Sequence, residues 1–227
     1  MQRNRNATFA WILIWATALM FVALLGHPAT GGHGRSTQEL LEAVYVARFH
    51  LGVMHGAAIV LQLVAATCIL AFCRQLGLAQ PLVAFAAVAF AAATGGICVA
   101  GSIDGFLVPA FAAPHLTLGG GGPLDMRAAI AAGAITIQYS TKFAIALMAA
   151  ANFLLSLQLI AIPALRVVGT MGMVLSIVQC IALLTSAVLT PHNVAFSILP
   201  ALIWQVVLGI VWRTQTEDVR SSTLRDA

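Results

Sequence analysis

The stretch that decides the fold class is PLVAFAAVAFAAATGGICVAGSIDGFLV, residues 81–108. No charged side chain precedes Asp104 in this stretch, and Asp104 stands four residues before its end. At a rise of 1.5 Å per residue, a helix of about 20 apolar residues spans the roughly 30 Å hydrocarbon core of a bilayer. The stretch therefore predicts a transmembrane helix with a carboxylate close to one end.

The composition of the whole chain indicates the same class. Hydrophobic residues make up 61% of the 227 residues and charged residues 8%, against about 45–50% and about 25% in soluble domains. The mean hydropathy is +0.98. The net charge of +4 comes from a few basic residues that flank apolar segments. We therefore expect it to reflect membrane topology and not nucleic-acid binding.

Six apolar segments predict an all-α, polytopic membrane protein with a bundle of about six transmembrane helices. One of them, residues 128–162, is too long for a single crossing, so we expect 139–162 to span and 128–138 to lie at or beyond the surface. We expect residues 1–213 to form one transmembrane domain and residues 214–227 to form a short, polar, disordered cytoplasmic tail. The predicted spans are residues 9–26, 49–73, 81–108, 139–162, 167–190 and 193–212.

The distribution of Lys and Arg predicts the orientation of the chain. With both termini in the cytoplasm, seven of the 11 basic residues fall on the cytoplasmic side and four fall outside. Cytoplasmic loops of membrane proteins are enriched in Lys and Arg. We therefore expect a multi-pass protein of the cell inner membrane with both termini inside.

Ionisable and polar side chains from several parts of the chain converge on one predicted layer. Counting from the cytoplasmic helix ends places this layer about 27–35 Å away, at the outer edge of the hydrocarbon core. Such residues either mark the interface, where a charge costs little free energy, or line a shared pocket that binds a ligand or holds ion pairs. The predicted cluster comprises Arg48, His50, His55, Asp104, Tyr139, Lys142 and His192.

Three members of this cluster could hold a metal ion. His55, His192 and Asp104 would supply three ligands and leave one position open, as in catalytic zinc sites. His50 and His55 are five residues apart, so they point about 140° apart around a helix and are poorly placed to share an ion. His55 and His192 could alternatively be the two axial ligands of a haem.

A second polar layer is predicted deeper in the membrane, where uncharged amides hydrogen-bond between helices. The amides of this layer are Gln62, Asn152, Gln179 and Gln205.

No Gly-x-Ser-x-Gly or His-Glu-x-x-His motif marks a hydrolytic centre. The four cysteines lie in or beside apolar segments, and we expect them to behave as small hydrophobic residues.

Two stretches carry a resemblance to a known group of proteins. The basic start MQRNRNATFAWILIWATAL (1–19) and the stretch DGFLVPAFA (104–112) resemble small uncharacterised bacterial inner-membrane proteins of about this length. The resemblance implies a six-helix membrane fold and assigns no catalytic residue.

We expect the protein to be a binding, transport-accessory or complex-associated membrane subunit that works through the outer cluster. Its partners would be the lipid bilayer, other membrane subunits or a small lipid-like ligand, and not nucleic acid. The alternative is a membrane-embedded metal- or haem-dependent enzyme that uses His55, His192 and Asp104.

Overall fold

The computed structural model describes the backbone of residues 2–27, 37–112, 123–186 and 190–225. In these ranges the regular elements are helices, without strands. Six of the described helices are long and apolar enough to cross a membrane, which confirms the predicted all-α membrane fold. The elements are α1 (Gln2–Leu25), α2 (Thr37–Leu76), α3 (Pro81–Ser102), η1 (Ile103–Leu107), α5 (Pro123–Ile160), η2 (Pro163–Leu165), α6 (Arg166–Thr185) and α7 (Pro191–Arg225).

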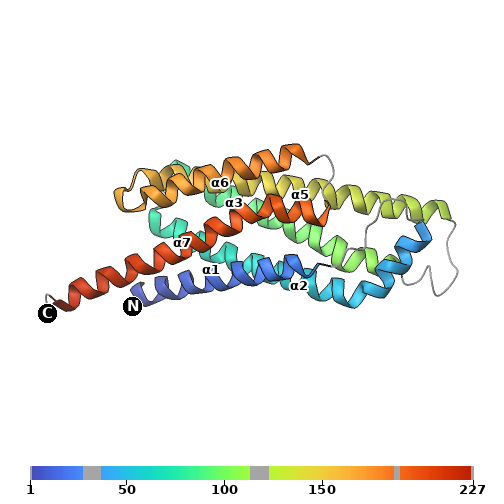
Figure 1. Cartoon of the computed structure of the whole chain (residues 1–227), viewed down its shortest axis with the longest axis horizontal. Helices are drawn as coiled ribbons and strands as arrows, with labels where there is room; N and C mark the ends of the chain where they lie inside the picture. The colour runs from blue at the N-terminus through green and yellow to red at the C-terminus, as the bar shows by residue number, and fades with distance from the viewer. Residues whose placement is uncertain (1, 28–36, 113–122, 187–189, 226–227) are drawn as a thin grey trace.

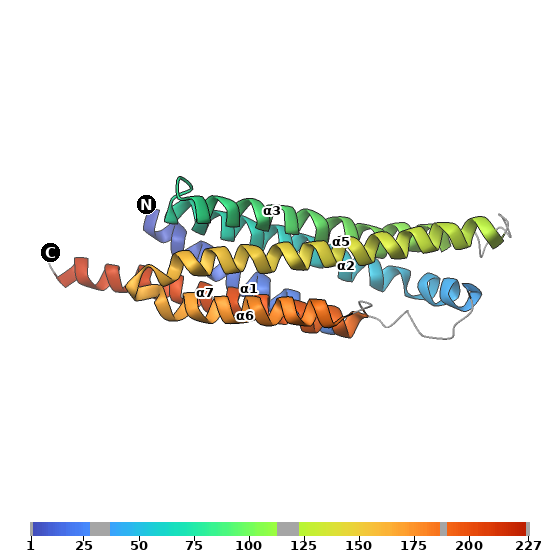
Figure 2. The same ribbon diagram turned by 90° about the horizontal axis from the view of Figure 1, so that it is seen from above.

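The six long helices run alternately up and down and form a closed ring. Each one packs against the next along the chain, and α1 packs against α7. The start of α1 and the end of α7 lie at the same end of the bundle (Figures 1 and 2). We call the opposite end, away from both chain termini, the distal end.

Two helices are much longer than the sequence predicts. α2 has 40 residues and α5 has 38, about 60 Å and 57 Å of helix, against a hydrocarbon core of roughly 30 Å. Both extend past α1, α6 and α7 at the distal end (Figure 2). The predicted span 49–73 is part of a helix that begins 12 residues earlier, at Thr37, and residues 128–138 continue the same helix as 139–160.

The distal extension has a small hydrophobic core of its own. Leu41, Val44 and Leu51 of α2 are buried together with Ala112, which follows η1. Leu41 and Val44 lie one turn apart on a helix, so they present one apolar stripe. This stripe explains why residues 37–47 are helical although they contain two glutamates and a glutamine.

The main core fills the ring along the membrane-spanning part of the helices. Small residues, which are frequent in residues 84–96, allow close packing there. A Cβ added to Gly96 of α3 would lie 3.0 Å from the Ala144 Cβ and 3.2 Å from the Ser140 carbonyl oxygen of α5. α3 and α5 therefore approach each other almost backbone to backbone.

The four amide side chains of the predicted second polar layer are buried. Gln62 donates to the Thr94 hydroxyl at 3.1 Å, and the Thr17 hydroxyl donates to Gln205 at 3.3 Å. Asn152 and Gln179 are also buried.

All four cysteines are free. α7 continues as a helix to Arg225, through the segment that we expected to be a disordered tail.

Candidate metal centre

Three side chains, one from the residue two positions beyond α1, one from α2 and one from η1, meet near the distal end of α1. His27 Nε2 lies 3.0 Å from His55 Nε2, and both nitrogens face Asp104 Oδ2, at 3.7 Å and 3.2 Å respectively. The side chains are 18%, 14% and 33% exposed, in the same order. The group is therefore mostly buried yet open to small solutes. Such a cluster of two imidazoles and a carboxylate can hold a metal ion.

The end of α1 is attached to α2 just beside the cluster. The last carbonyl groups of a helix have no partner within the helix. His50 Nε2 lies 3.0 Å from the Gly26 carbonyl oxygen and satisfies one of them. A Cβ on Gly26 would lie 2.9 Å from the Met54 Cε of α2, so Gly26 and α2 are in close contact. His27 follows Gly26 directly, and this attachment therefore places its imidazole against α2.

Asp104 lies in η1, a short π-helical segment that continues α3. The Val108 N–H donates to the carbonyl of Ile103, five residues earlier. π-helical turns inside α-helices occur frequently at functional sites, because the extra residue turns side chains away from their helical positions. η1 therefore gives Asp104 a direction that an uninterrupted α-helix would not.

Glycines bring η1 and α2 close together. A Cβ on Gly105 would collide with the His55 Cβ and would lie 2.9 Å from the His55 Cγ. The Phe106 ring lies 3.6 Å from the Cβ position of Gly52 and 3.4 Å from that of Gly56. Gly52 and Gly56 form a Gly-x-x-x-Gly face on α2, a pattern that permits close helix contact. Asp104 reaches His55 because no side chain separates the two backbones.

The three atoms have the spacing of ligands in a tetrahedral zinc site. With bonds of about 2.0–2.1 Å, neighbouring ligand atoms in such a site are about 3.3 Å apart. The three distances here are 3.0, 3.2 and 3.7 Å. A triangle with these sides has a circumradius of about 1.9 Å, so an ion with bonds of about 2.05 Å would lie about 0.7 Å above its plane. A tetrahedral ion lies one third of its bond length, again about 0.7 Å, above three of its ligands.

No arrangement of ring protons satisfies all three contacts. A neutral imidazole carries one N–H. If both Nε2 atoms carry protons, two N–H groups oppose each other at 3.0 Å. If only His27 Nε2 carries a proton, the lone pair of His55 Nε2 faces the Asp104 carboxylate at 3.2 Å. If only His55 Nε2 carries a proton, the lone pair of His27 Nε2 faces the Asp104 carboxylate at 3.7 Å. A cation accepts all three lone pairs and removes the conflict.

The predicted cluster is therefore only partly a single site. His55 and Asp104 come together as expected, and His50 acts beside them through its contact with Gly26. Arg48 donates to the Tyr45 carbonyl at 2.7 Å and stacks over the Tyr45 ring, so its guanidinium is bound within α2.

The other members of the predicted cluster are distributed differently. Tyr139 is 70% exposed on α5, and Lys142 is half-buried on the same helix. The backbone of His192 lies in the first turn of α7, but its side chain is outside the described residues.

Sequence reasoning missed His27, because the residue lies just outside the first predicted span, residues 9–26. The depth argument that we applied to the other residues would have found it. His27 follows the first apolar segment by one residue, so it lies at the same predicted boundary as His55 and Asp104. The Gly-x-x-x-Gly spacing of Gly52 and Gly56 was a second signal.

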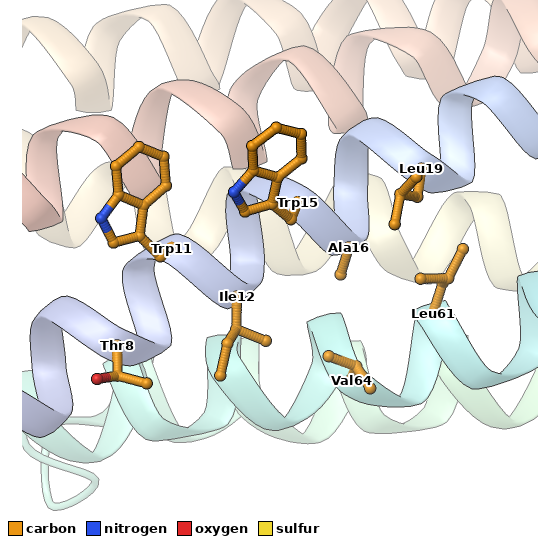
Figure 3. Close-up of a pocket in the computed structure, with 8 residues that line it drawn as sticks. All are labelled: Thr8, Trp11, Ile12, Trp15, Ala16, Leu19, Leu61 and Val64. Atoms are coloured by element: carbon orange, nitrogen blue, oxygen red, sulfur yellow. The ribbon is translucent and has the colours of Figure 1, made fainter.

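A separate hollow lies between α1 and α2. It is an open groove of about 380 Å³, and Figure 3 shows Ile12 and Ala16 of α1 on the side of Leu61 and Val64 of α2, whereas the Trp11 and Trp15 rings point away from α2 in this view. No acidic, basic, histidine or cysteine side chain is among its lining residues. The groove is therefore almost wholly apolar and offers no ligands for a metal.

No protein-family model, curated protein or solved structure matches this chain. The resemblance to bacterial inner-membrane proteins stays a prediction, and the candidate centre is identified by its geometry alone.

Proposed function

We propose that the protein is a membrane-embedded metal-binding protein, with His27, His55 and Asp104 as the metal ligands. The observation that carries the proposal is the convergence of two Nε2 atoms and one carboxylate oxygen within 3.7 Å of one another. This proposal favours the metal-dependent alternative from the sequence and replaces one of its ligands, His192, with His27.

The ligand types favour zinc or a similar transition metal. Imidazole nitrogen suits Zn²⁺, Co²⁺ and Cu²⁺, whereas Mg²⁺ and Ca²⁺ prefer oxygen ligands. Structural zinc sites usually have four protein ligands, while catalytic sites have three and keep one position for water or substrate. Three ligands support a centre of the second type. The chemistry that such an ion supplies is polarisation of a bound water or of a substrate oxygen.

Titration of metal-stripped protein with Co²⁺ in detergent tests the proposal. Tetrahedral Co²⁺ absorbs visible light far more strongly than octahedral Co²⁺, and we expect this absorption to saturate at one ion per chain. Zn²⁺ should displace the Co²⁺. The variants His27→Ala, His55→Ala and Asp104→Asn should each abolish the tetrahedral absorption.

Glu42→Gln is the matched control for Asp104→Asn. Glu42 is an exposed carboxylate on α2 that accepts a hydrogen bond from Gln38 at 2.8 Å. This variant should bind Co²⁺ as the unmodified protein does. A Co²⁺ spectrum in the unmodified protein that equals that of Co²⁺ in water, and that the three ligand variants leave unchanged, would contradict a metal centre. They would instead support the other expectation, a polar surface for an anionic headgroup or a partner subunit.

We also propose that the protein lies in the cell inner membrane with both termini in the cytoplasm. The support is the excess of Lys and Arg on the side of the termini. The metal centre would then face the outside. A reporter that fluoresces only in the cytoplasm, fused after Ala227, should be fluorescent. A periplasmic phosphatase fused there should be inactive, and the reverse pattern would contradict this orientation.

A further inference from the structure

The seam between α6 and α7 contains buried polar atoms that lack hydrogen bonds. Gln179 of α6 and Ser197 of α7 are both fully buried. Both amide atoms of Gln179 and the Ser197 hydroxyl have no hydrogen-bond partner among the described residues. Nearly all buried polar groups in proteins are paired with protein or with ordered water. Three unpaired atoms in one region therefore require an explanation.

The contacts between α6 and α7 place Gln179 and Ser197 at the same level. Trp204 of α7 donates from Nε1 to the Val168 carbonyl of α6 at 3.2 Å, and a Cβ on Gly172 would collide with the Trp204 ring. Ser197 precedes Trp204 by seven residues, and Gln179 follows Gly172 by seven. Seven residues are about two helical turns. Because the helices are antiparallel, both side chains lie two turns distal to this contact, on the faces that form it.

A proline supplies a further polar group at this level. Pro200 lies inside α7 and is buried. Proline has no N–H, so it cannot donate to the carbonyl of residue i−4, which is Phe196. Phe196 immediately precedes Ser197. In membranes, the backbone groups that a proline leaves free are satisfied by neighbouring side chains or by ordered water.

We propose that α6 and α7 enclose ordered water at the level of Gln179, Ser197 and the Phe196 carbonyl. A buried water needs two to four polar partners, and these groups provide both donors and acceptors. All of them are uncharged, so the site suits water better than an ion, whose charge would need compensation. The site is independent of the His27, His55 and Asp104 centre.

Nuclear magnetic resonance of protein labelled with ¹⁵N only at glutamine tests this proposal. We expect cross-relaxation between water and the side-chain amide protons of Gln179. Gln62 is the matched internal control, because it is buried to the same degree and its amide nitrogen donates to Thr94. Its amide protons should show no cross-relaxation with water.

Two variants assign the signals and add independent readouts. Gln179→Met removes the Gln179 signal, and Ser197→Ala should shift it and weaken its cross-relaxation with water. A Gln179 amide without cross-relaxation to water would overturn the proposal. A higher melting temperature for Gln179→Met would also overturn it, because replacement of a dry, unpaired amide by an apolar side chain stabilises a protein.

Discussion

The His27→Ala variant should lose the stabilisation that zinc gives to the protein. A structural zinc site with four ligands contributes about 10–16 kcal/mol of binding free energy, or about 2.5–4 kcal/mol per ligand. Loss of one of the three proposed ligands should therefore weaken binding by roughly 10²–10³-fold. His27 is the most informative ligand to remove, because it lies beyond the end of α1 and contributes little to the core.

The expected change in thermal stability follows from mass action. Free zinc at 100 times the dissociation constant stabilises the folded state by about 2.7 kcal/mol. For a chain of this size that corresponds to a melting temperature higher by about 5–11 °C. In His27→Ala the same zinc concentration would be at or below the dissociation constant, so the stabilisation falls to at most about 0.4 kcal/mol.

Thermal unfolding in detergent, followed by the fluorescence of the four tryptophans, measures both quantities. Without zinc, His27→Ala should be no less stable than the unmodified protein, because the mutation leaves one imidazole and one carboxylate, whose contact a single N–H on His55 Nε2 satisfies. An unchanged zinc-dependent shift in His27→Ala would refute the assignment of His27 as a ligand. A large loss of stability without zinc would refute the argument about the protons.

Three further predictions concern the surroundings of the centre. His50→Ala should weaken zinc binding about 10–100-fold although His50 is not a ligand. His50→Gln should bind zinc nearly normally, because its amide can donate to the Gly26 carbonyl. Equal affinities of the two variants in a zinc titration would contradict a role of His50 in holding Gly26. In thermal unfolding, Gly105→Ala should destabilise the protein by about 1–3 kcal/mol, because the added methyl group would collide with His55. Gly95→Ala should have little effect, because nothing lies within 4 Å of the added Cβ. Zinc affinity should fall as the pH is lowered from 7.5 to 5.5, because an imidazole must be deprotonated to bind a metal; a constant affinity in this range would argue against histidine ligands.

Much of the fold can be predicted from hydropathy. Each of the six predicted spans overlaps one of the described helices that can cross a membrane, because an uninterrupted apolar run has no other stable structure in lipid. The distal extension was harder to predict. Residues 37–47 contain polar side chains on one face and Leu41 and Val44 on the other. Their helix depends on burial against Ala112, a contact between segments that are distant in the sequence.

The candidate site was predictable in depth but not in composition. Counting residues from the helix ends places His55 and Asp104 in one layer, and they do come together. Counting residues cannot tell which side chains in a layer face each other, because that depends on the rotation of each helix about its own axis. The direction of Asp104 depends on the π-helical turn in η1, and no residue pattern in 103–107 marks such a turn.

The most direct test of the metal centre is elemental analysis of the purified protein by plasma mass spectrometry, before and after incubation with zinc and removal of the excess. The account predicts one zinc ion per chain after incubation, retained in Glu42→Gln and lost in Asp104→Asn. Less than a tenth of an ion per chain in the unmodified protein, or equal zinc in Asp104→Asn, would contradict it.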